Sequence, residues 1–271
     1  MQIRGIDFSG GQRPGTDIWI AEGRLEAGTL RIDRCQSATE RFDETGREAI
    51  LRALRETLTR KEGTTGLDFS FGLPAALLPD DVETWGDATG WFARAFADAD
   101  ATEMREQLKS DARSLQGDGV ELKRRTDRTV GASSPYSFIT YYQTLYGIRD
   151  VLAPLVEAGT VAVPPLESPS NRNVIEIYPA GTLRRLGTAD TKYKDGASNA
   201  ERRRERIVGR LTDPGPEMRL ELPAGVRKTV LEEPGGDALD SVIAAVATAR
   251  AVDRGFEPER PFDAREGHIY V

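Results

Sequence analysis

The stretch RGIDFSGG at residues 4–11 and the stretch TGLDFSFGLP at residues 65–74 share a pattern that decides the fold. In each stretch, residues typical of a strand lead to an aspartate, Asp7 or Asp68, and Phe-Ser follows. In open α/β sheets, functional clefts lie beyond the carboxyl ends of the strands. We therefore expect the two carboxylates to meet at one edge of a sheet.

The elements around these two stretches follow an order that predicts a mixed sheet. Residues 2–7, 16–23 and 28–37 have the composition of strands, and glycines bracket the connection between the second and the third. Residues 44–60 carry leucine and isoleucine at helical spacing, before the strand that ends at Asp68. Three strands, a helix and a fourth strand predict an α/β sheet with a helical crossover.

The remainder of the chain is predicted to be largely helical. We expect one domain over residues 1–271, in which residues 80–157 form a helical insertion or cap. The candidate helices in that region are residues 89–113 and 137–159. After it we expect strands at 160–166 and 173–179, helices at 198–211 and 236–255, and a loop at 212–236.

Composition limits the classes of protein to consider. The chain has 271 residues, a net charge of −7 and one cysteine, Cys35. The acidic balance counts against extended nonspecific binding of nucleic acid, and one cysteine excludes a disulfide framework within the chain. The chain has no apolar run of membrane-spanning length and no signal-peptide pattern at its start, so we expect a cytoplasmic protein. The single histidine, His268, disfavours sites built from several histidines.

Acidic residues form the strongest candidate for a functional site. Asp7 and Asp68 follow strands, Asp237 and Asp240 lie three apart on the late helix, and Glu176 lies inside an apolar run. Several carboxylates in one cleft repel one another unless a cation lies between them. Mg²⁺ and Mn²⁺ prefer oxygen ligands, and paired ions of this kind support phosphodiester cleavage. The expected metal ligands are Asp7, Asp68, Asp240 and Glu176, with Asp237 assisting catalysis.

Structural explanations for the same acids stay open. An aspartate after a strand is often a turn former, and Asp237 could be a simple helix N-cap. Glu176 could form an ion pair with an arginine such as Arg184 or Arg185, which are near in sequence. The combination of two echoed strand ends with a pair of acids on one helix favours the functional interpretation.

Glycine-rich and basic segments supply candidate substrate contacts. Ser9 and Gly10 could present backbone N–H groups to a phosphate, or the glycines could simply form the turn after the strand. Lys192 and Lys194 flank Tyr193, whose ring could stack on a base. Basic clusters of this kind are more often solvated helix faces than binding sites, an alternative that applies most strongly to residues 201–206.

These motifs resemble the domain of unknown function 429 family, which is commonly described as predicted nucleases of ribonuclease H-like fold. The resemblance rests on GIDFSGG, GLDFSFGLP, RRTDR, EIYPAGTLRRLG, TKYK, GDALDSVIAAVATARA and EGHIYV, which run through nearly the whole chain. It implies a ribonuclease H-like, mixed five-stranded sheet flanked by helices. It also implies that Asp7, Asp68, Asp237 and Asp240 are the acids of a metal site, and it adds Arg125 and Asp127 of RRTDR as substrate contacts.

The expected function is therefore metal-dependent cleavage of phosphodiester bonds, with nucleic acid or a nucleotide as the substrate. Two alternatives stay open: a nucleotide-binding phosphotransferase or ATPase of the same fold class, and a non-catalytic nucleic-acid-binding module. The sequence leaves the exact substrate and the oligomeric state undetermined.

Overall fold

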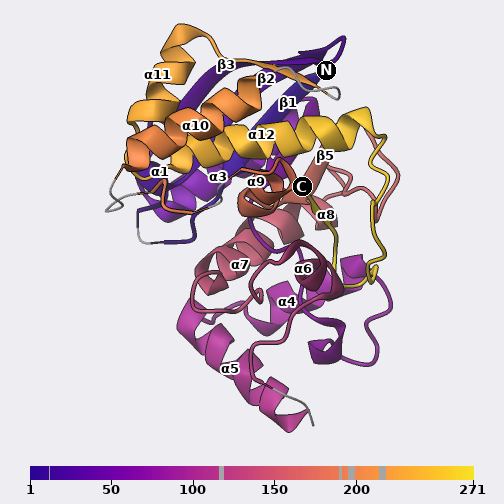
Figure 1. Cartoon of the computed structure of the whole chain (residues 1–271). Helices are drawn as coiled ribbons and strands as arrows, with labels where there is room; N and C mark the ends of the chain where they lie inside the picture. The colour runs from indigo at the N-terminus through magenta and orange to yellow at the C-terminus, as the bar shows by residue number, and fades with distance from the viewer. Residues whose placement is uncertain (12, 116–118, 189–190, 195–198, 214–217) are drawn as a thin grey trace.

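The computed structural model describes residues 1–11, 13–115, 119–188, 191–194, 199–213 and 218–271. It is a mixed α/β structure in which a twisted sheet and its covering helices form one part, and the helices of residues 85–157 extend from it (Figure 1). Among the described residues, no helix is both long and apolar enough to cross a membrane.

Among the described residues, seven strands form the sheet, in the order β6-β3-β2-β1-β4-β5-β7. Their bounds are β1 Gln2–Asp7, β2 Trp19–Glu26, β3 Thr29–Ser37, β4 Gly63–Leu67, β5 Arg172–Ile177, β6 Arg219–Glu221 and β7 Ile269–Tyr270. The first three strands are an antiparallel meander, whereas β4 is parallel to β1 and β5 is parallel to β4. The expectation of a mixed sheet is confirmed, although the sheet has seven strands and not five.

Two short edge strands account for the additional pairing. β6 is parallel to β3, and β7 is parallel to β5. The prediction of a loop over 212–236 was wrong, because this segment contains β6 and the helix α11 (Ala224–Glu232). The prediction of a strand over 160–166 was also wrong, because only Ala162 forms a bridge there. Pro164 and Pro165 lack the N–H groups that a strand ladder requires.

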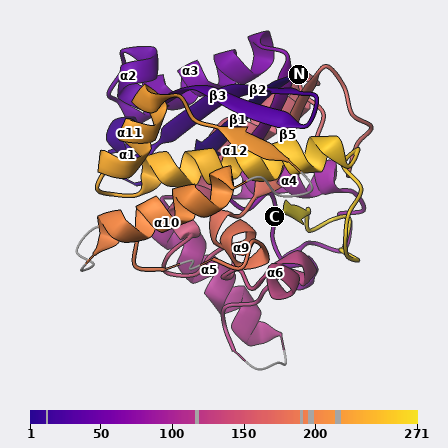
Figure 2. The same cartoon turned by 45° about the horizontal axis from the view of Figure 1, so that its top comes forward.

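Helices cover both faces of the sheet. On one face lie α1 (Pro14–Asp17), α2 (Ala38–Phe42) and α3 (Arg47–Arg60). The buried leucines of α3 pack on residues of β1, β2 and β4. On the other face, α12 (Asp237–Asp253) runs across the sheet, beside α10 (Ala200–Thr212) and α11 (Figure 2). The small helix α9 (Pro179–Arg185) follows β5.

The region between β4 and β5 is helical. It contains a short 3₁₀ turn and then α4 (Trp85–Ala95), α5 (Ala101–Ser114), α6 (Arg125–Val130), α7 (Tyr141–Gly147) and α8 (Ala153–Glu157), with a π-helical turn before α8. The predicted helix over 89–113 is two helices, because Asp100 caps a new helix by accepting from the N–H groups of Thr102 and Glu103. The description of this region as an insertion stays a prediction.

The approach of α12 to the sheet depends on two glycines. A Cβ atom at Gly5 would lie 2.1 Å from the backbone nitrogen of Ala245, and one at Gly66 would lie 2.1 Å from Oγ1 of Thr248. The helix is buried along most of its length and presents mainly small residues. Because neither strand carries a side chain at these positions, the helix backbone lies close to β1 and β4. The first turn of α12 therefore lies near the end of β1.

Candidate metal centre

Two of the predicted acids lie side by side at the carboxyl ends of parallel strands. The register pairs Ile6 of β1 with Leu67 of β4, so Asp7 and Asp68 occupy equivalent positions at the same sheet edge. The rings of Phe8 and Phe69, one residue further along each chain segment, are 4.8 Å apart between centroids. The sequence-based expectation that the two echoed segments meet at one edge is confirmed in this geometry.

The first turn of α12 adds two more acids. Asp237 and Asp240 both lie in that turn. The N-cap residue is Gly236, and Glu233 accepts hydrogen bonds from the N–H groups of Gly235 and Ala238. Asp237 is therefore not the N-cap, and a capping role does not explain its position.

Three carboxylates converge at this point. Asp7, Asp237 and Asp240 each offer an oxygen, and these oxygens all lie within 4.8 Å of one another. Asp7 is 8% exposed and Asp240 is 3% exposed. Within the described part of the chain, the carboxylate of Asp7 has no hydrogen bond or ion pair. Asp68 is partly buried and lies near this group without belonging to it. We call Asp7, Asp237 and Asp240 the acidic cluster.

The segment that carries Tyr193 and Lys194 closes one side of the acidic cluster. Lys194 Nζ lies 2.6 Å from Oδ2 of Asp240 and 3.1 Å from Oδ1 of Asp237. The hydroxyl of Tyr193 donates to Oδ1 of Asp240 at 2.7 Å. The Tyr193 ring is buried in the core, so it presents no exposed face on which a base could stack. Lys194 is therefore the predicted basic residue that the structure brings to the acids.

A buried arginine holds this segment in place. Arg204 of α10 donates from Nη1 to the carbonyl oxygen of Tyr193 at 2.8 Å and from Nε to that of Leu231 at 2.8 Å. Arg204 is 5% exposed and is the exception within residues 201–206, most of which are exposed as expected for a solvated face. The spacing of Arg204, Ile207, Val208 and Leu211 on one helix face is the signal that could have identified it.

The electrostatics of the cluster favour an added cation. Burial, followed by repulsion from Asp240, Asp237 and Asp68, raises the pKa of Asp7 well above its usual range, although Lys194 opposes this. Burial also raises the pKa values of Asp68 and Asp240. For Lys194, burial disfavours the charge, but the neighbouring carboxylates raise its pKa overall. One ammonium could not balance four carboxylates if all were ionised, and an oxygen-only donor set of this kind suits Mg²⁺ or Mn²⁺.

Glu176, a predicted metal ligand, lies in a different cluster. Both of its oxygens accept from Arg124, with Nη1 to Oε2 at 2.7 Å, and Oε2 also accepts from the N–H of Phe71 at 2.9 Å. Arg124 is fully buried and also binds Asp127. The open alternative of an ion pair is therefore what the structure shows, with Arg124 as the partner and not Arg184 or Arg185.

The other predicted contacts are dispersed. Asp127 is buried in its ion pair with Arg124, and Arg125 is exposed on α6, where its N–H donates to Glu266. Lys192 is exposed, with a left-handed backbone. None of these three contacts the acidic cluster within the described part of the chain.

The turn of Ser9 and Gly10 follows Asp7 directly. Ser9 Oγ accepts from the N–H of Gly11 at 3.1 Å, and Arg47 donates to the carbonyl oxygen of Gly10. A Cβ atom at Gly10 would lie 2.3 Å from the backbone of Tyr142 in α7. Gly10 is thus needed for close packing against α7, a reason that the sequence did not indicate.

The fold and this site define a class: an α/β protein with a carboxylate cluster at the carboxyl edge of its central parallel strands. Residues 152–264 match the family described as protein of unknown function (DUF429), which confirms, over that part of the chain, the resemblance found in the sequence. No curated protein and no solved structure matches the chain. The family description names no activity, so the function has to be argued from the site.

Proposed function

We propose that this protein is a metal-dependent phosphodiesterase, acting as a nuclease on nucleic acid or a nucleotide. The central strand order β3-β2-β1-β4-β5, with an antiparallel meander and two parallel strands, agrees with the ribonuclease H-like core that the family resemblance implies. In this proposal β6 and β7 are additions to the edges of that core.

The observation that carries the proposal is the convergence of Asp7, Asp237 and Asp240. The three carboxylates come from two elements, Asp7 is 8% exposed, and no described residue donates a hydrogen bond to its carboxylate. A carboxylate that serves only packing or capping is normally satisfied by donors. A carboxylate that receives no hydrogen bond from a described residue, beside two others, is explained by a cation that the three share.

The residues of the site fit distinct parts of the reaction. Asp7, Asp237 and Asp240 would hold Mg²⁺ or Mn²⁺, and Asp68 would complete the set from β4. Bound ions of this type supply activation of water and stabilisation of the departing oxygen. Lys194 carries a positive charge to the same place and would contact a substrate phosphate oxygen once a metal satisfies Asp240. Tyr193 holds Asp240 in position through its hydroxyl.

Cleavage assays with purified protein test the proposal. DNA, RNA and a cyclic dinucleotide should be cleaved in the presence of Mg²⁺ or Mn²⁺ and not with chelator present. Asp7→Asn should lower the rate by about 10³-fold or more, since it removes a charged group that acts on the reacting atoms. Asp81→Asn, at an exposed position without side-chain partners among the described residues, is the matched control and should retain full activity.

Two results would contradict the proposal. The first is cleavage that persists in Asp7→Asn with chelator, which would point to a contaminating enzyme or another site. The second is the absence of any stabilisation by Mg²⁺ or Mn²⁺ in thermal unfolding, which would leave the acids with a structural role alone.

A further inference from the structure

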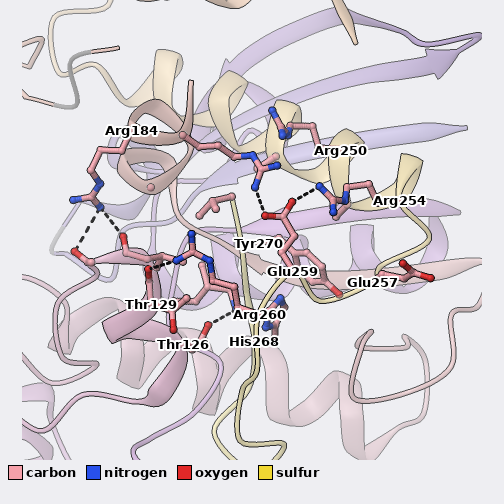
Figure 3. A pocket seen from close by; sticks show the side chains of 18 of the residues that line it. Thr126, Thr129, Arg184, Arg250, Arg254, Glu257, Glu259, Arg260, His268 and Tyr270 are labelled. Carbon is pink, nitrogen blue, oxygen red and sulfur yellow. Dashed lines mark hydrogen bonds and ion pairs between the residues drawn. The ribbon is translucent and has the colours of Figure 1, made fainter. Parts of the chain in front are cut away.

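A cavity lies away from the acidic cluster, between α6, α9, the carboxyl-terminal half of α12 and the end of the chain (Figure 3). Its volume is about 490 Å³, within the range of small-molecule sites. Arg250 of α12 and Arg254, the C-cap residue of that helix, line it, and they follow Asp240 by ten and fourteen residues. At about 1.5 Å of helix rise per residue, that separation is on the order of 15–20 Å. The cavity is therefore distinct from the candidate metal centre.

Positive charge dominates the wall of this cavity. Six arginines line it, against two glutamates: Arg128, Arg184, Arg185, Arg250, Arg254 and Arg260 face Glu257 and Glu259. Glu259 is engaged by both Arg185 and Arg254, so one carboxylate serves two guanidinium groups. Arg260 is fixed by donation to the carbonyl oxygen of Thr129 at 3.0 Å. Guanidinium groups from separate elements that line one cavity suit phosphate, which they bind in a forked geometry.

An unsatisfied buried side chain in the same wall points independently to a ligand. His268 is 9% exposed and lines the cavity, and its Nδ1 is buried without a hydrogen-bond partner among the described residues. The ring packs on Phe262 and Tyr270, which fix its plane. Burial and the nearby Arg124 lower the pKa of His268 to about 4, so the ring is neutral at neutral pH. A neutral imidazole can donate to or accept from a polar group of a bound molecule.

The remaining wall is apolar and suits the organic part of a ligand. Ala247, Ala251 and Tyr270 form this side of the cavity. Gly181 of α9 also lines it, and a Cβ atom there would lie 2.7 Å from Cγ1 of Val271. Because Ala247 and Ala251 lie next to Arg250 on α12, the cavity presents apolar and cationic groups side by side, which fits a molecule with a charged group and an apolar part.

We propose that this cavity binds a small phosphate monoester, such as a nucleoside monophosphate or a sugar phosphate. The arginines would hold the phosphate, His268 would bond a polar group of the body, and the alanine and tyrosine wall would contact its apolar surface. The inference does not depend on the nuclease proposal, because no residue of the acidic cluster lines this cavity.

Histidine NMR tests the inference directly, since His268 is the one histidine in the chain. Protein labelled with ¹⁵N at histidine is titrated with AMP, ribose 5-phosphate or adenosine, with chelator present throughout. Saturable shifts of the imidazole signals are expected with AMP or ribose 5-phosphate, and adenosine at equal concentration should give none. Shifts with AMP alone would assign a nucleotide, and shifts with both would assign the phosphate as the main determinant.

Matched variants locate the binding. Arg128→Gln combined with Arg260→Gln removes two exposed arginines of the cavity and should weaken AMP binding about tenfold or more, from the lost charge-assisted hydrogen bonds. Arg202→Gln, an exposed arginine on α10 that does not line the cavity, should leave the affinity unchanged. Asp7→Asn should also leave it unchanged, which separates this site from the metal centre.

Three outcomes would overturn the inference. They are the absence of a saturable shift with either phosphate ester, equal shifts with adenosine, and an affinity that the double variant does not change.

Discussion

The molecule contains two buried clusters of charge that are built in opposite ways. In the first, Arg124 lies between Asp127 and Glu176, and its guanidinium donates to both carboxylates. In the second, Asp7, Asp237 and Asp240 share the single ammonium of Lys194, which contacts only two of them. The first cluster is satisfied by its own side chains, whereas the second carries an excess of negative charge.

The contrast separates a structural role from a functional one. Arg124 joins α6 to β5 and also donates to the carbonyl oxygen of Glu266 near the chain end, so its contacts connect three distant segments. No described residue satisfies Asp7 in this way, and its pKa is raised by burial and by its acidic neighbours, against the opposing effect of Lys194. Grouping carboxylates in this way destabilises the folded protein, and binding of a cation would offset that destabilisation.

Breaking the satisfied cluster should have the largest effect on stability. Arg124→Met leaves Asp127 and Glu176 buried without their cation, and the free energy of unfolding should fall by about 3–5 kcal/mol. Urea denaturation measures this change. Arg128→Met, an exposed position on the same helix, should change stability by less than about 0.5 kcal/mol. Equal effects of the two variants would mean that the Arg124 cluster is not a stabilising unit.

The pH dependence of stability provides the next test, through His268 beside the Arg124 cluster. The pKa of His268 in the folded protein, about 4, lies below the ordinary value of 6.5. The contribution of neutral His268 to the free energy of unfolding is therefore fully present above pH 6.5 and is lost as the pH falls through 4. The loss should reach about 3 kcal/mol. Unfolding of His268→Gln should lack this part of the pH dependence. Parallel curves for the two proteins between pH 4 and pH 7 would contradict the prediction.

Adding a cation should stabilise only the unsatisfied cluster. At a Mg²⁺ or Mn²⁺ concentration about 100 times the dissociation constant, the free energy of unfolding should rise by about 2.7 kcal/mol. The rise should be absent in Asp7→Asn and unchanged in Asp81→Asn. Thermal or urea unfolding with and without chelator measures it, and a full rise in Asp7→Asn would place the metal elsewhere.

Neutralising one acid should improve the stability of the metal-free protein. Because burial and like charges make ionised Asp7 unfavourable, Asp7→Asn should raise the free energy of unfolding by about 1 kcal/mol in chelator. The same variant is expected to lose activity, so stability and function should change in opposite directions. A destabilised variant would indicate that Asp7 makes a favourable contact in the folded protein.

The smallest expected effect concerns the resident ammonium group. Lys194→Ala removes a cation that competes with metal at Asp240, so Mg²⁺ affinity should increase roughly two- to fivefold, the range of a partly exposed ion pair. Lys192→Ala, which has no contact with the acids, is the control and should change nothing. Calorimetric titration distinguishes the two variants. A lower affinity in Lys194→Ala would mean that the lysine organises the site instead of competing for it.

Sequence reasoning succeeded where local pattern and chemistry agree. The echo of Asp-Phe-Ser at two strand ends placed Asp7 beside Asp68, and the helical spacing of Asp237 and Asp240 placed both on the first turn of α12. The prediction of Glu176 as a metal ligand failed, because an acidic residue within an apolar run indicates only that its side chain has a partner. The partner, Arg124, is 52 residues away in the chain. The short strands β6 and β7 were missed for a similar reason, since their pairing depends on an edge supplied by distant strands.

The sequence by itself determined the mixed sheet, the crossover helix and the two strand-end aspartates, because these follow from the periodicity of nearby residues. Only the tertiary structure decided which charges meet. Gly5 and Gly66 allow α12 to lie against the sheet and bring Asp240 near Asp7, while Arg124 takes Glu176 into a separate buried pair. Electrostatic interactions act over a few ångströms in space, and the distance along the chain does not specify them.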